Sequence, residues 1–249
     1  MGKMTYADRA GYKIRDQAAT HFLTFTVVGR IDIFSRKRYR DIMLESLDFC
    51  RKNKGLQLNA NVIMSNHIHF IWTSTDKNLS GLIRDFKSHT SKRLTASIQE
   101  EPESRRDWLL HLFRFHANQT NANEIFRVWT GDNHPEEIHS APFFTTKLNC
   151  IHQNPVRNGL VANPASYLYS SASNYEGRKG LIDIDILHWQ PRSFQLRGCI
   201  MSPPETCDNT KQPCIPHFPF PISHSPLPIP PYSLNLPHAT PQIPISLKR

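Results

Sequence analysis

The stretch NVIMSNHIHFIWT (Asn61–Thr73) places two histidines beside short apolar runs. Runs rich in β-branched and aromatic residues predict buried strands, and the Ser65–Asn66 pair predicts a tight connection between them. Alternate residues of a strand share a face, so His67 and His69 should point the same way while Ile68 points into the core. Two imidazoles side by side on a rigid sheet can bind a divalent metal ion. The same pattern also occurs on ordinary protein surfaces, so by itself it decides little.

Strands and helices are predicted on both sides of this stretch. Apolar alternation and helical periodicity predict strands at 21–29, 56–64, 67–73 and 181–187 and helices at 39–53, 78–98 and 141–154. Asn78 or Ser80 can cap the second helix, and Pro155 is expected to end or bend the third. The segment 108–116 mixes aromatic rings with cations, which suits either single-strand DNA binding or packing on the core.

The charge balance favours a polyanionic partner. The chain of 249 residues carries a formal net charge of +9, and its isoelectric point is about 9.5. Nucleic acid is favoured over membrane, although a merely basic soluble protein explains the charge as well. There is no signal-peptide pattern and no run long enough for a membrane span. Five irregularly spaced cysteines predict reduced thiols and a cytoplasmic location.

Composition divides the chain near residue 187. Residues 188–249 contain 14 of the 19 prolines. Such a segment cannot pack into helices or central strands, so we expect a disordered, Pro-rich tail that is not part of the functional unit. Residues 1–187 are long enough to form one domain with its own core, and we assign catalysis and DNA binding to them.

A second informative stretch is KLNCIHQNPVRNGLV (Lys147–Val161). Together with MSNHIHFIW it resembles the REP-associated tyrosine transposases, which are single-strand DNA transposases of the HUH endonuclease type. The resemblance spans about Arg15 to Leu187. It implies a ferredoxin-like α+β fold, with helices packed on one face of an antiparallel sheet, and a homodimer. The implied partner is single-stranded or hairpin DNA from a mobile element.

The resemblance also implies a site. His67, His69 and Asn154 would bind Mg²⁺ or Mn²⁺ beside the scissile phosphate, and a tyrosine on the same helix as Asn154 would attack the phosphate to give a covalent 5′-phosphotyrosine. In this chain the position of that tyrosine is Cys150. A cysteine is shorter than a tyrosine, and a soft thiolate suits a hard phosphoryl centre poorly. We therefore expect DNA strand cleavage and transfer to be impaired.

Several cations are candidates for contacts with DNA phosphates. They lie in a basic cluster before the first predicted helix, along the second helix, and after the metal-site helix: Arg36, Lys37, Arg38, Arg84, Lys87, Lys92 and Arg157. Each is also explained by an ordinary solvated surface. Two alternative functions stay open at this point. One is a non-catalytic DNA-binding or regulatory protein derived from a transposase, and the other is a small-molecule phosphoesterase, which would leave the second motif without a reason.

Overall fold

A four-stranded antiparallel sheet forms the centre of the protein. In the computed structural model, residues 14–120 and 125–187 are described. The strands are β1 (His21–Thr26), β2 (Leu56–Ile63), β3 (His67–Ser74) and β4 (Glu136–Glu137). Their spatial order is β2-β3-β1-β4, and each neighbouring pair is antiparallel. The α+β class predicted from the sequence is confirmed, whereas the finer ferredoxin-like assignment stays a prediction.

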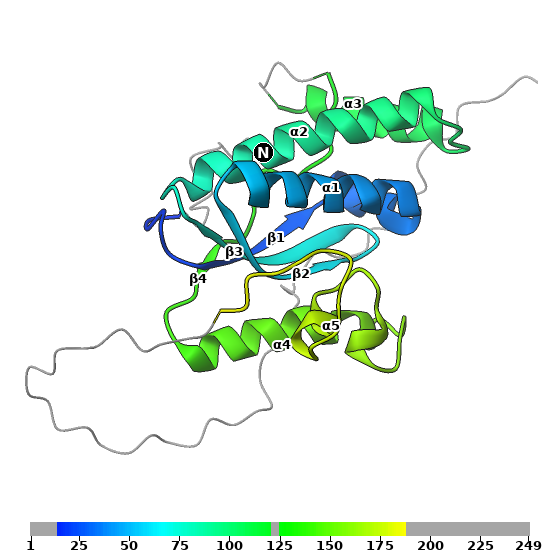
Figure 1. Cartoon of the computed structure of the whole chain (residues 1–249). Coiled ribbons are helices and arrows are strands. Elements are labelled where there is room, and N and C mark those ends of the chain that lie inside the picture. The colour runs from blue at the N-terminus through cyan, green and yellow to red at the C-terminus, as the bar shows by residue number, and fades with distance from the viewer. Residues whose placement is uncertain (1–13, 121–124, 188–249) are drawn as a thin grey trace, which may run out of the picture. The chain divides into compact units, whose positions relative to one another are not determined.

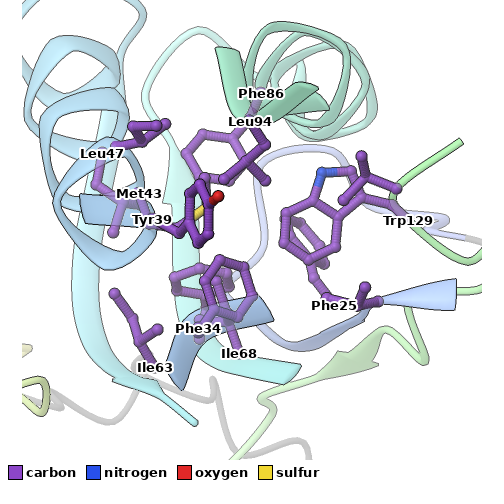
Figure 2. Close-up of a cluster of buried hydrophobic side chains, with 14 of the residues drawn as sticks. Phe25, Phe34, Tyr39, Met43, Leu47, Ile63, Ile68, Phe86, Leu94 and Trp129 are labelled. Carbon is purple, nitrogen blue, oxygen red and sulfur yellow. The ribbon is translucent and has the colours of Figure 1, made fainter. Parts of the chain in front are cut away.

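One face of the sheet is covered by two helices. These are α1 (Lys37–Asn53) and α2 (Leu79–Glu100), and both lie on the same side of the strands in Figure 1. Phe25, Ile68 and Phe70 point from the strands into this layer. Figure 2 shows Phe25 beside Trp129, in the same buried cluster as side chains of α1 and α2. Asn78 caps α2, as predicted, because its side chain accepts a hydrogen bond from the Gly81 amide.

The opposite face is also covered. The helix α4 (Ala141–Arg157) and the short helix α5 (Ala172–Tyr175) lie on the other side of the sheet in Figure 1. Phe144 and Ile151 of α4 join a second apolar cluster with Phe22, Val62 and Ile71 from the strands. The prediction that helices pack on one face only is therefore wrong. Strands β1, β2 and β3 carry apolar residues on both faces, so each face requires a covering layer.

Two local predictions are wrong as well. Residues 181–187 are not a strand, although the Asp185 amide donates to the Leu58 carbonyl and the segment runs beside β2. Pro155 is expected from the sequence to end or bend α4. It does not end the helix, which continues to Arg157 with Pro155 buried in its last turn, so the first of these alternatives is wrong. The predicted disordered tail, 188–249, lies outside the described residues, and the division into 1–187 and 188–249 stays a prediction.

The segment with mixed rings and cations forms the helix α3 (Arg106–Asn118), which packs against α2. Leu109, Phe113 and Ala117 are buried, whereas Trp108 and Phe115 are about half exposed. No helix in the part of the chain that the structure describes combines the length and the apolar character needed to cross a bilayer.

Candidate metal and DNA site

The two histidines of β3 lie side by side on the α4 face of the sheet. Ile68, Phe70 and Trp72 belong to the cluster beneath α1 and α2, so alternation directs His67 and His69 to the other face. Their ring centroids are 4.8 Å apart with an interplanar angle of 70°. His69 is 7% exposed and His67 is half-buried. The orientation predicted from strand alternation is therefore present.

Each imidazole is oriented by a hydrogen bond at Nδ1. His67 Nδ1 lies 2.7 Å from Asn66 Oδ1, an atom that can only accept, so His67 donates. His69 Nδ1 lies 2.9 Å from Oγ1 of Thr24, which is the residue paired with His69 across β1 and β3. A neutral ring that donates from Nδ1 carries its lone pair on Nε2. This is the usual arrangement for a histidine that binds a metal ion through Nε2.

Burial keeps both rings neutral. Desolvation, with a smaller contribution from the charge of Arg30, lowers the pKa of His67 to about 4. Desolvation also lowers the pKa of His69, and the charges of His67 and Lys147 act in the same direction. Both side chains are therefore uncharged near pH 7, the protonation state in which imidazole binds metals.

Helix α4 brings the second motif to the same face. The Ser140 side chain accepts a hydrogen bond from the Phe143 amide, which fixes the start of α4. Asn154 is half-buried on this helix, and its Oδ1 accepts a hydrogen bond from Asn158 Nδ2 at 2.9 Å. The helix and both imidazoles thus lie on one side of the sheet, while the convergence of Asn154 and the imidazoles on one ion stays a prediction.

Cys150 is almost inaccessible on α4. It is 4% exposed and is disulfide-bonded, whereas Cys50 is a free, buried thiol. The expectation of reduced cysteines thus holds for Cys50 and fails for Cys150. The neighbouring His152 lies 3.0 Å from Ser171 Oγ and packs against the ring of Tyr175. His152 is thus engaged with the segment around α5.

The basic cluster at the start of α1, which is predicted to bind DNA, forms ion pairs within the protein. Arg36 Nε and Arg38 Nη2 lie 2.8 and 3.0 Å from one oxygen of the buried Glu103, and Tyr39 donates to the same oxygen at 2.8 Å. Lys37 pairs with Asp41 one turn later. The like charges at the start of α1 are therefore balanced by a carboxylate from the α2–α3 connection.

The predicted cations on α2 differ from one another. Arg84 pairs with Asp85, and Lys87 donates to the Thr130 carbonyl and to Asn133. Lys92 on α2 and Arg157 on α4 are both exposed, and within the described residues neither pairs with another side chain. Of the seven candidates, only Arg157 lies on α4, the helix that covers the sheet face with His67 and His69. The role of each as a DNA contact stays a prediction.

Two cations beside the histidines were not predicted as site residues. Arg30 lies in the turn after β1, and its carbonyl accepts a hydrogen bond from Asn66, the residue that orients His67. Lys147 forms an ion pair with Glu136 at 2.7 Å and lies over the rings of Phe22 and Phe143. Neither stands out in the sequence, because the pairing of β1 with β3 and the position of α4 bring them here.

The α4 face of the sheet thus carries two neutral imidazoles side by side, with α4 lying over the same face. Residues 16–124 match the family model described as IS200-like transposase. The match covers β1 to α3, including both histidines, and ends before α4. The resemblance to transposases is thereby confirmed for this part of the chain.

Comparison with solved structures gives a more distant similarity. One match is described as a REP-associated tyrosine transposase bound to a REP hairpin. It is 19% identical, covers 80% of this chain and 100% of that one, and has a TM-score of 0.47. No curated protein matches the chain.

Proposed function

We propose that this protein binds single-stranded or hairpin DNA as a member of a transposase lineage whose strand-cleaving step is impaired. The observation that carries the proposal is the pair of neutral, oriented imidazoles on the α4 face, inside the segment that matches the transposase family model. The formal charge of +9 agrees with a polyanionic partner. Assembly as a homodimer and a cytoplasmic location belong to the same proposal.

Three side chains of the α4 face are the proposed ligands of a divalent cation. His67 and His69 would each contribute Nε2, because Nδ1 of each ring is held by Asn66 or Thr24. Asn154 would contribute its carbonyl oxygen, a hard ligand suited to Mg²⁺ or Mn²⁺. Such an ion would polarise a nonbridging phosphate oxygen and orient the phosphate. Arg30 and Lys147, whose charges act on His67 and His69, would add positive charge near the bound phosphate.

The site has Cys150 in place of the tyrosine that would attack the phosphate. A tyrosine at position 150 would extend a phenol well beyond the helix, whereas the Cys150 sulfur stays close to the backbone at 4% exposure. Cys150 is also disulfide-bonded, so it has no free thiolate, which is the reactive form of cysteine. This supports a protein that binds the DNA but transfers strands poorly.

An alternative is a purely DNA-binding or regulatory protein that has lost metal binding too. The hydrogen bonds at Nδ1 of His67 and His69 do not favour it, because they orient both rings so that Nε2 could bind an ion. The alternative predicts salt-sensitive DNA binding that is independent of Mn²⁺, whereas our proposal predicts that the ion still binds.

The test is restoration of the nucleophile. Wild type, Cys150→Tyr and Cys150→Phe are incubated with a labelled stem-loop oligonucleotide and Mn²⁺, and covalent adducts are counted on denaturing gels. Cys150→Phe is the matched control, because it imposes the same ring without a hydroxyl group. We expect an adduct from Cys150→Tyr alone. A folded Cys150→Tyr protein that binds the oligonucleotide but forms no adduct would contradict the catalytic part, and a wild type that binds no DNA would contradict the whole proposal.

A further inference from the structure

Helix α3 has an outer surface that stays exposed among the residues that the structure describes. Its inner surface is buried through Leu109, Phe113 and Ala117. Trp108 and Phe115 are 49% and 50% exposed, and His111 between them is exposed too. These three residues are spaced by three and four positions, so they form one stripe along the helix. We call this set, Trp108, His111 and Phe115, the aromatic stripe.

The C-terminal end of the aromatic stripe lies near the turn after β1, which is hydrogen-bonded to the residue that holds His67. His116, next to Phe115, lies against the turn after β1, where a Cβ on Gly29 would be 3.3 Å from its Nε2. The following residue, Arg30, accepts a hydrogen bond from Asn66 at its carbonyl, and Asn66 holds His67. The end of α3, the Arg30 turn and the start of β3 are therefore joined by direct contacts at one end of the sheet.

Two arginines lie near the stripe or its C-terminal end, Arg114 and Arg30, and Arg30 has a strained backbone conformation. Arg114 is exposed beside the stripe, with its guanidinium 5.3 Å from the ring centre of Phe126. Arg30 adopts φ +53°, a conformation that costs a non-glycine residue energy and often marks functional positions. Exposed rings interleaved with cations suit a strand whose bases are unpaired, because each base can stack and each phosphate can be neutralised.

We propose that the aromatic stripe of α3 is a stacking platform for the unpaired nucleotides that flank a DNA hairpin, and that it guides them past Arg30 to the face that bears His67 and His69. This inference rests on the proposed DNA-binding function and adds the part of the substrate that α3 recognises. Stacking on rings is tolerant of sequence, so the platform selects single-stranded character rather than particular bases.

The experiment compares two probes on the full-length protein. One is a stem-loop with a single-stranded extension that carries 2-aminopurine, and the other is the same stem-loop with blunt ends. The variants are Trp108→Ala/Phe115→Ala and, as a matched control, Phe49→Ala, which removes a ring of similar exposure from α1. We expect the double variant to lose roughly tenfold or more in affinity for the extended probe, with reduced 2-aminopurine quenching. Its affinity for the blunt probe and its melting temperature should match those of Phe49→Ala.

Four other results would contradict the inference, and they separate it from the proposed DNA-binding function. If wild type binds the extended probe and the double variant binds it equally well, the stacking platform is wrong and the DNA-binding function stands. If the double variant loses both probes to the same extent, the stripe does not read unpaired nucleotides, and the inference fails. If the substitutions convert a dimer into a monomer in sedimentation, the stripe is an interface between copies and the inference is overturned. If wild type binds neither probe, both proposals fail together.

Discussion

His69 Nδ1 on β3 lies 2.9 Å from Thr24 Oγ1 on β1, directly across the sheet. The hydroxyl is the only hydrogen-bond partner of that ring nitrogen among the described residues, and the buried imidazole also packs against the rings of Phe22 and His67. A hydrogen bond at Nδ1 holds the ring in one orientation and so fixes the direction of Nε2. The first prediction follows from this contact.

Thr24→Val should weaken Mn²⁺ binding by roughly 10–100-fold, because the substitution removes the hydroxyl that orients His69 while it keeps the branched shape. Thr24→Ser, which keeps the hydroxyl group, should bind the ion nearly as well as wild type. Isothermal titration of the three proteins measures the effect. Equal affinities for Thr24→Val and wild type would show that the contact does not prepare His69 as a ligand.

Glu103 should make stability depend on acid pH. Burial alone would raise the pKa of Glu103, but hydrogen bonds from the Arg105 amide and Tyr39, and the charges of Arg36 and Arg105, lower it to about 2. A pKa depressed in the folded state gives stability that is present above the unfolded value, near 4.5, and is lost as pH falls toward 2. The contribution is about 3 kcal/mol at neutral pH.

Glu103→Gln tests this dependence. Urea unfolding at pH 6 should show the variant less stable than wild type by a few kcal/mol, and the difference should shrink as the pH is lowered from 4.5 toward 2.5. Glu101→Gln is the control, because its carboxylate is largely exposed. If the difference in the free energy of unfolding between Glu103→Gln and wild type stays constant over this pH range, ionisation of Glu103 does not contribute to stability as predicted.

Arg30→Gly should change stability and DNA affinity in opposite directions. Arg30 has φ +53°, which glycine adopts without a Cβ penalty, so the free energy of unfolding should rise by roughly 0.5–1 kcal/mol. The loss of one phosphate contact should weaken DNA binding and reduce its salt slope by about 1. Urea unfolding measures the change in stability. Fluorescence anisotropy at several salt concentrations measures the DNA affinity and its salt slope.

Lys77→Gly provides the control for Arg30. Lys77 is also exposed at φ +53°, but it lies in the connection between β3 and α2. It should gain similar stability without loss of DNA affinity. If the two variants weaken DNA binding equally, the effect is one of overall charge rather than of a specific contact beside His67.

The sequence predicts those features of the site that depend on local geometry. Strand alternation is sufficient to place His67 and His69 on one face, and the Ser65–Asn66 pair marks the connection before them. Helical periodicity likewise predicts α1, α2 and α4, because each buries one stripe of apolar residues. These elements need no knowledge of distant partners.

The remaining features depend on contacts between residues far apart in the chain. Glu103 neutralises Arg36 and Arg38 from more than sixty positions away, so a candidate phosphate-binding cluster proves to be an internal network. Pro155 lies within the last turn of α4 because a proline removes only one hydrogen bond and its ring is buried there. Residues 181–187 alternate like a strand, yet their hydrogen bonds to β2, among the described residues, all involve Asp185. Periodicity alone could not reveal any of these outcomes.

The central claim is that His67, His69 and Asn154 hold one divalent cation on the α4 face of the sheet. Titration of Mn²⁺ into wild type, His67→Ala/His69→Ala, Asn154→Ala and the exposed control His89→Ala tests it most directly. We predict one site in wild type and in His89→Ala, weakened binding in Asn154→Ala, and no binding in the double histidine variant. Equal Mn²⁺ affinity in wild type and the double histidine variant, or no binding by wild type, would contradict the account.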